Sequence, residues 1–199
     1  IQYKVMQKLF PCRKTVLGDA SQSVNPYGSS TADMIQKALV TGEVMKLCKS
    51  YRSTCEITDF AQKIRTNTDL EPVARHGEKP RVLQYNNEKE ELSSIKELIA
   101  TYQASAYKSL GIVCKTESQA CEMADKLQIP DIHFLSNQSS AFVQGIVIIS
   151  AHMAKGLEFD EVIIPQVDDR NYHSEIDRSM LYVACLLYTS PSPRDRSVS

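Results

Sequence analysis

Two glycine signatures of nucleotide-binding proteins are missing from this sequence. None of the seven glycines is followed by lysine, so the phosphate-binding loop G-x-x-x-x-G-K-[ST] is absent. No two glycines lie two positions apart, which removes the dinucleotide pattern G-x-G-x-x-G as well. The chain therefore encodes neither a complete P-loop ATPase nor a Rossmann dehydrogenase.

Patterns typical of metal sites, membrane spans and strongly basic proteins are also missing. The six cysteines form no C-x-x-C pair and none lies near a histidine at metal-ligand spacing, so we expect reduced, packed thiols and no metal site. No apolar run approaches the roughly 20 residues that span a bilayer, and the N-terminus lacks the form of a signal peptide, so we expect a cytoplasmic protein without a membrane partner. The formal net charge of -1 gives no bulk attraction for nucleic acid, and an anionic partner needs a local arrangement of groups.

Short apolar or β-branched runs alternate along the chain with segments of helical pattern. The runs lie at Lys14–Leu17, Val44–Leu47, Arg81–Gln84, Gly111–Cys114, Ile132–Leu135, Ile146–Ile149 and Glu161–Ile164. Strands alternating with helices predict an α/β fold with a mainly parallel sheet and flanking helices. Ligands gather at the carboxyl ends of such strands, which directs attention to the loops after Leu17, Leu47 and Ile149.

Helix starts are also readable. Capping-box patterns at Ser53–Glu56 and Thr116–Gln119 predict two helices, and Ser174–Asp177 is expected to open a third. An apolar stripe that begins at Leu92 and ends at Tyr102, with acids ahead of it, predicts another. The polar segment Asn67–Lys79 is expected to be a loop between structural units.

Three blocks of polar residues follow expected strands. They read VLGDASQSVNPYG (16–28), LCKSYRSTCEITDFA (47–61) and SAHMAKGLEFDEVIIP (150–165). In order and spacing they resemble motifs III, IV and V of the ATP-dependent helicases of the UvrD/Rep type, within superfamily 1. The stretches GDASQS, NPYG and DRSMLYVAC are most similar to the HelD-like branch, which acts with bacterial RNA polymerase.

The resemblance implies a RecA-like P-loop NTPase fold and a division of the chain. Residues 1–39 would end a first RecA-like domain, 40–185 would form most of the second, and 186–199 would be a tail foreign to the protein. The implied parent is an ATP-dependent DNA helicase or translocase of the 3′–5′ UvrD-like kind, with single-stranded DNA as its track. ATP and Mg²⁺ are the implied cofactors, with the Mg²⁺ ligands upstream of this chain, so the fragment alone is expected to be inactive.

Two other functions stay open. One is a HelD-like ATPase that displaces or recycles RNA polymerase. The other is a non-catalytic module that binds nucleic acid or polymerase, although such a scaffold has no reason to keep Gln22, Arg52 and the run Lys155–Phe159 intact.

Two side chains are the candidate catalytic residues. Arg52 carries a planar donor fork that matches phosphate, and Gln22 suits a γ-phosphate or its attacking water. The resemblance places both at the γ-phosphate, with Tyr51 packed or stacked against the nucleotide. The alternatives are a turn-capping glutamine and a surface ion pair made by Arg52.

The remaining candidate nucleotide contacts lie in the first and third blocks. Gly18 forms a bend beside Asp19, which is either a nucleotide contact or a turn acid. Gly156 lets the backbone approach a phosphate closely, and Glu158 can accept a hydrogen bond from a ribose hydroxyl. We expect Arg52 and Gly156 to lie at carboxyl ends of strands in one sheet, facing the same cleft as Gln22.

Nucleic-acid contacts are implied in the third block. Ser150, His152 and Lys155 are the candidates, with a packed histidine as the alternative for His152. Leu157 and Phe159 are expected to return to the core.

The sequence departs from the family pattern at two places. Asn25 stands where an aromatic residue is usual. Leu186 and Leu187 stand where motif VI continues with Thr-Arg, and the alternating serines and prolines at 190–193 require the last helix to stop by about Ser190.

Overall fold

The computed structural model describes residues 2–10, 12–13, 15–18, 37, 43–66, 70–136 and 144–189. Within these residues the elements follow in the order α1 (Gln2–Leu9), β1 (Lys49–Ser50), α3 (Cys55–Ile64), β2 (Glu71–Pro72), α4 (Glu88–Gln103), β3 (Ser109–Cys114), α5 (Glu117–Leu127), β4 (Ile132–Leu135), β5 (Gly145–Ser150), α6 (Ala151–Ala154), β6 (Glu161–Ile163) and α7 (Glu175–Cys185).

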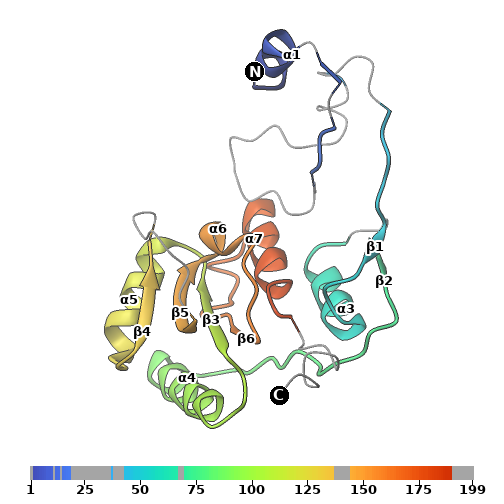
Figure 1. The fold of residues 1–199 in the computed structure, drawn as a ribbon. Coiled ribbons are helices and arrows are strands. Elements are labelled where there is room, and N and C mark those ends of the chain that lie inside the picture. Colours follow the sequence, from blue (N-terminus) through green and yellow to red (C-terminus); the bar gives the residue numbers. More distant parts are fainter. Residues whose placement is uncertain are drawn as a thin grey trace.

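A four-stranded parallel sheet organises the larger part of the molecule (Figure 1). Its strand order is β4-β5-β3-β6, and β3 pairs with β5 along its whole length, from Ser109 opposite Gly145 to Cys114 opposite Ser150. The helix α5 connects β3 to β4 and the short helix α6 lies between β5 and β6, as expected for crossover connections between parallel strands. The expected α/β fold with a mainly parallel sheet is confirmed.

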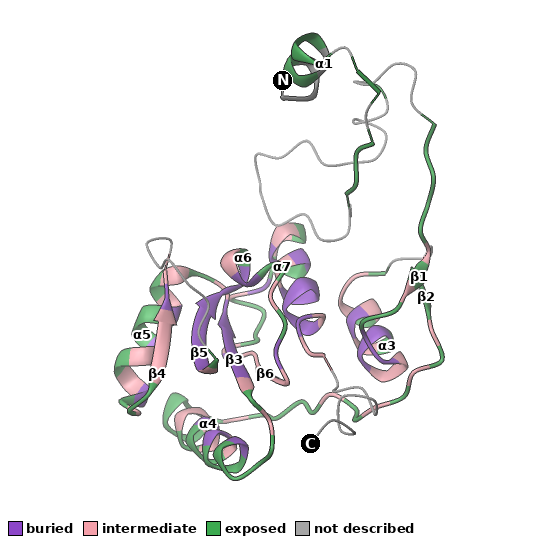
Figure 2. Cartoon of the chain, viewed as in Figure 1, coloured by how far each residue is buried: buried purple, intermediate pink, exposed green. Residues whose placement is uncertain are grey.

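The two central strands bury both faces, as Figure 2 shows. On β3, Ile112 packs in the cluster formed with α4 and α5, whereas Val113 packs in the cluster formed with α7. On β5, Ile148 and Ile149 divide between the same two clusters. Continuous apolar runs are typical of strands covered on both sides, which is why these two strands could be identified from the sequence.

Two of the three expected helix starts are closed by capping boxes. Thr116 and Ser174 each accept a hydrogen bond from the backbone of the residue three positions on, and the box is reciprocal at both helices. The third prediction is wrong by one residue, because Thr54 caps α3 by accepting from Ile57 N. The Glu56 side chain contacts a distant loop instead of closing a box.

Three expected strands are absent from the described structure. Residues 15–17 and 44–47 have no regular structure, and the strand ahead of Arg52 is the two-residue β1. Residues 81–84 are likewise irregular, and Val82 is 69% exposed. These runs lack a neighbouring strand to pair with, and β-propensity alone does not hold so short a run in place.

The segment expected to be a loop between units contains a strand. β2 lies parallel to β1 in a separate two-stranded sheet, with Lys49 opposite Glu71 and Ser50 opposite Pro72. The prediction of an irregular linker at 67–79 is therefore wrong for its middle part, and the pairing ties this segment to the residues that precede Arg52.

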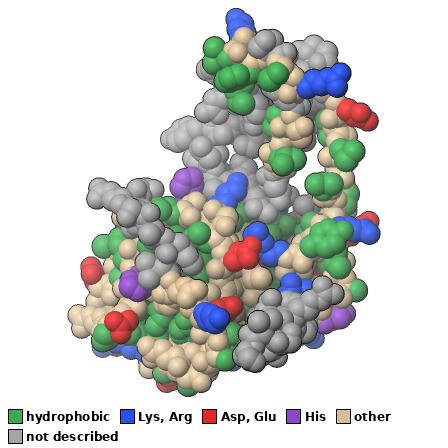
Figure 3. Space-filling view, in the orientation of Figure 1, with side chains coloured by type: hydrophobic (Ala, Val, Ile, Leu, Met, Phe, Trp, Pro, Cys, Tyr) green, Lys and Arg blue, Asp and Glu red, His purple; other side chains and the backbone are tan. Residues whose placement is uncertain are grey.

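Large apolar side chains are exposed on the N-terminal segments, which form the upper part of Figure 3. They include Leu9 at 66%, Met45 at 82% and Leu47 at 82%. None of the helices in the described parts of the chain has the length and apolar character needed to cross a membrane. The proposed boundary at residues 39 and 40 lies outside the described residues.

Candidate functional site

Arg52 and Glu158 form the central contact of the candidate site. The Arg52 Nη2 atom lies 2.7 Å from Glu158 Oε1, and both side chains are 49% exposed. Two blocks far apart in the sequence therefore meet through oppositely charged side chains. The ion pair that the sequence left open as an alternative for Arg52 is present, and its partner is another predicted site residue.

The two residues reach this contact from different sheets. Arg52 follows β1 in the two-stranded sheet, whereas Glu158 follows α6 and the central strand β5 of the four-stranded sheet. The expectation that Arg52 and Gly156 follow strands of one sheet is therefore wrong. The contact of the two blocks arises instead where α3, which follows Arg52, packs beside α7, as Figure 1 shows.

The loop before Glu158 contains a glycine, Gly156, in a backbone conformation that other residues rarely adopt. Gly156 has φ of 93°, and an added Cβ would meet no atom within 4 Å. The requirement for glycine is therefore conformational, and the space beside the backbone is open. An open, exposed backbone at this point is suited to a close approach by a phosphate group.

The far end of the loop is anchored in the core. Phe159 is 1% exposed, and its ring packs against the backbone of Gly111 in the central strand β3. The Phe159 amide donates to Leu187 O at 3.0 Å, and its carbonyl accepts from Thr189 N at 2.9 Å. The expected return of Phe159 to the core is confirmed, and Glu158 is held next to a fixed point.

The position where the family pattern has an arginine contributes no donor side chain. Leu186 is the C-cap of α7, and Leu187 is 3% exposed in the core. The helix ends before Ser190, as the prolines beyond it require. Residues 190–199 lie outside the described part of the chain, so their foreign origin stays a prediction.

The three candidate nucleic-acid contacts differ in exposure. Ser150 ends β5 and is 4% exposed, whereas His152 and Lys155 are exposed on α6 and just after it. In this arrangement His152 and Lys155 present their side chains to solvent at the carboxyl edge of the sheet. Ser150 serves as the N-cap position of α6.

The first block is only partly described. Gly18 is exposed and has no regular structure, and an added Cβ would contact nothing within 4 Å. Asp19 and Gln22 lie outside the described residues. Tyr51, directly before Arg52, is 72% exposed and presents its ring to solvent.

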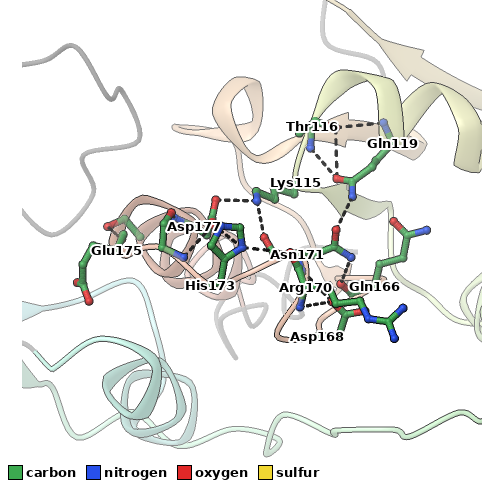
Figure 4. Close-up of polar contacts among 12 residues, drawn as sticks. Lys115, Thr116, Gln119, Gln166, Asp168, Arg170, Asn171, His173, Glu175 and Asp177 are labelled. Atoms are coloured by element: carbon green, nitrogen blue, oxygen red, sulfur yellow. Dashed lines mark hydrogen bonds and ion pairs between the residues drawn. The ribbon is translucent and has the colours of Figure 1, made fainter.

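Sequence reasoning missed a polar cluster at the carboxyl end of β3, drawn in Figure 4. The Lys115 Nζ atom lies 2.7 Å from Asp177 Oδ1 and also donates to the carbonyl of Asn171. Gln119 donates to Asn171 Oδ1 at 3.1 Å. The cluster ties the start of α5 to the loop before α7. A lysine directly after a buried strand was the signal that could have revealed it.

Asp177 has two functions in this cluster. Its carboxylate accepts from Ser174 N at 3.0 Å to close the capping box, and it pairs with Lys115, whose side chain is 18% exposed. Burial alone would raise the pKa of Asp177, but hydrogen bonds from Lys115 and Ser174 lower this pKa to about 2. The carboxylate therefore stays charged under all ordinary conditions.

The described residues contain no group of three or more histidine, cysteine, aspartate or glutamate side chains that could hold a metal ion. Cys114 and Cys185 are both buried, and burial raises the pKa of each thiol to about 12. Thiols with such pKa values remain protonated and unreactive at neutral pH.

Comparison with known proteins shows what part of this chain is similar to. The model of the UvrD-like helicase C-terminal domain matches residues 132–185, which run from β4 to the end of α7. This part of the chain is similar to the UvrD-like helicase C-terminal domain. The resemblance to UvrD-type helicases is confirmed for this segment, which contains the third block, and the α/β fold agrees with the RecA-like fold of that family. The similarity to the HelD-like branch stays a prediction.

A solved structure extends the similarity beyond that segment. The chain is similar to the C-terminal domain of a possible DNA helicase from Lactobacillus plantarum WCFS1, with 27% sequence identity and a TM-score of 0.58. The match covers 70% of this chain and 83% of that one. No curated protein matches the chain. The segment similar to the UvrD-like family thus contains the Glu158 loop and Asp177, the partner of Lys115.

Proposed function

We propose that this chain is part of a cytoplasmic, ATP-dependent DNA helicase or translocase, in which Arg52 contacts the nucleotide phosphates. The observation that supports this most strongly is the 2.7 Å contact between Arg52 and Glu158. It brings a guanidinium fork and a glycine-containing loop together at one exposed place. Arg52 binds phosphate and Glu158 a ribose hydroxyl when the nucleotide is bound.

The energetics of the ion pair suit an exchangeable contact. Both side chains are half exposed, and exposed ion pairs contribute about 0–1 kcal/mol. Phosphate offers a guanidinium two parallel hydrogen bonds, which are among the strong charge-assisted ones. Arg52 can therefore exchange Glu158 for a phosphate at little cost, and Tyr51 offers a ring at 72% exposure beside it.

ATP and Mg²⁺ stay within the proposal. The exposed Arg52 guanidinium and the open backbone at Gly156 fit a phosphate chain, and Mg²⁺ would neutralise developing charge on its oxygens when bound. Gln22 is proposed to position the attacking water. RNA polymerase as a partner rests on the sequence stretches GDASQS, NPYG and DRSMLYVAC alone and stays a prediction.

Phosphate binding tests the proposal directly. The chain titrated with ATP or tripolyphosphate should show binding by calorimetry or by NMR shifts at Arg52. Arg52→Ala should abolish this response, and Glu158→Gln should strengthen tripolyphosphate binding because the competing carboxylate charge is gone. Arg178→Gln is the matched control, since Arg178 is an exposed arginine of α7 placed 3.9 Å from Glu175. Equal affinity of Arg52→Ala and the unchanged chain would contradict the proposal.

Single-stranded DNA binding tests the second half of the site. Lys155→Ala should weaken binding of an oligothymidylate uniformly and reduce the salt dependence of log K by about 0.7, the value for one phosphate contact on a single strand. His152→Ala should weaken binding at constant salt. Lys126→Ala, on the distant helix α5, is the control and should leave the salt dependence unchanged. An unaltered slope for Lys155→Ala would remove Lys155 from the DNA contact.

A further inference from the structure

The residues around Arg52 are held by the segment that follows α3. Glu71 N donates to Cys48 O at 2.7 Å, and Val73 N donates to Ser50 O at 3.2 Å. These bonds belong to the parallel pair β1 and β2, which ends two residues before Arg52. The backbone is therefore fixed immediately ahead of the arginine.

The same segment also holds the backbone after Arg52. Cys55 N donates to Arg75 O at 2.8 Å, and the Cys55 thiol donates to Val73 O at 3.4 Å. The Arg75 Nη1 atom donates to the carbonyl of Arg52 itself at 3.2 Å. Hydrogen bonds from one short segment thus reach residues on both sides of Arg52 and the Arg52 carbonyl.

A carboxylate on α3 secures the end of this segment. Glu56 Oε2 accepts from Gly77 N at 2.9 Å, and Glu56 Oε1 lies 2.9 Å from His76 Nδ1. The hydrogen bond with His76, followed by backbone hydrogen bonds that include Gly77, lowers the pKa of Glu56 to about 2. Glu56 is therefore a permanent anion, and its side chain is only 17% exposed.

The absence of a side chain at Gly77 allows the segment to close. An added Cβ would lie 2.7 Å from Thr54 Cγ2, and Thr54 is 1% exposed and caps α3. A buried cap residue cannot move aside without disturbing the start of the helix. Gly77 is thus required by its close approach to Thr54, which lies two residues after Arg52 in the sequence.

We propose that residues 71–77, here named the brace, position the backbone of Arg52 while leaving its guanidinium free to exchange Glu158 for a phosphate group. Glu56, Arg75 and Gly77 are positioning residues in this role. A guanidinium attached to a fixed backbone loses less freedom when it binds, which is the advantage of preorganisation. The phosphate step depends on the proposed function, whereas the positioning of Arg52 does not.

The first experiment uses the chain without a ligand. NMR order parameters of the Arg52 amide should fall from the rigid value of about 0.85 to below about 0.6 in Gly77→Ala, Glu56→Gln and Arg75→Gln. The amides of β3 and β5 should keep their order. Glu122→Gln, which neutralises an exposed carboxylate paired with Lys126 on α5, is the matched control and should leave Arg52 rigid.

The second experiment adds tripolyphosphate to the same variants. Loss of preorganisation should weaken tripolyphosphate binding by about threefold to tenfold in Gly77→Ala, Glu56→Gln and Arg75→Gln. Binding to Glu122→Gln should be unchanged. An Arg52 amide that stays rigid in all three variants overturns the brace, and so does a simultaneous loosening of β3 and β5. Loosening of Arg52 in a chain that binds no tripolyphosphate supports the brace and contradicts the proposed function.

Discussion

Replacing Phe159 with alanine is expected to lower the free energy of unfolding by about 3–5 kcal/mol. The Phe159 side chain is 1% exposed and belongs to the core cluster beneath α7. Its removal leaves a cavity against β3, where the surrounding strands cannot collapse without breaking their pairing. The chain contains no tryptophan, so urea unfolding is best followed by far-ultraviolet circular dichroism.

Gly111 provides a test of whether the ring and the strand backbone are matched in shape. An added Cβ at Gly111 would lie 2.7 Å from Phe159 Cδ2, so Gly111→Ala alone should be destabilising. In the Phe159→Ala background the Gly111→Ala methyl group enters the cavity, so it should lower the free energy of unfolding far less. The double variant should therefore be about 1–3 kcal/mol more stable than the sum of the two single effects predicts.

Leu127→Ala supplies the control background for this cycle. Leu127 is 1% exposed but belongs to the cluster on the opposite side of the sheet. Its cavity cannot receive a methyl group from Gly111, so the two substitutions should add within about 0.5 kcal/mol. Additivity with Phe159→Ala as well would mean that the Gly111 and Phe159 contact contributes nothing specific.

The sequence predicted well where local pattern and tertiary surroundings agree. β3 and β5 were identified from continuous apolar runs, and those runs are covered by helices on both faces. Val44–Leu47 has the same local character but pairs with no strand among the described residues, and Leu47 is 82% exposed. Whether a neighbouring strand exists is a property of the whole fold that no short window contains.

In the candidate site, too, the sequence identified individual residues but not the contacts between them. Arg52 and Glu158 were each singled out, as a phosphate ligand and a ribose ligand, but their direct contact depends on how α3 packs beside α7. Asp177 was recognised only as a helix cap, because its partner Lys115 lies on another element. The cap of α3 was ambiguous in the sequence because two hydroxyl residues, Ser53 and Thr54, stand side by side. Both are buried in the structure, and only the hydrogen bond to Thr54 identifies the cap.

The Lys115–Asp177 pair leads to the second large effect. Asp177→Asn keeps the size of the side chain and an oxygen for the Ser174 amide, but it leaves Lys115 without its counter-charge. Removing one partner of a buried pair costs about 3–5 kcal/mol, and the 18% exposure of Lys115 reduces this to about 2–4 kcal/mol at neutral pH. Urea unfolding of both proteins at neutral pH measures the difference.

The pH dependence of that difference identifies its cause. Because the folded-state pKa of Asp177 is lowered to about 2 from the ordinary value of 3.8, its contribution is complete above about pH 4 and is lost as the pH falls toward 2. The stability difference between the two proteins should therefore shrink over this interval. Glu56 titrates in the same range in both proteins, so its effect cancels in the difference.

Glu122→Gln is the matched control for this titration. Glu122 pairs with Lys126 on the surface of α5, with 58% of its side chain exposed, and such pairs contribute about 0.5 kcal/mol or less. The free energy of unfolding of Glu122→Gln should differ little from that of the unchanged chain at every pH. If Asp177→Asn gave an equally small difference, or one that stayed constant from pH 5 to pH 2, the Lys115–Asp177 charge interaction would not be what holds the start of α7 to the end of β3.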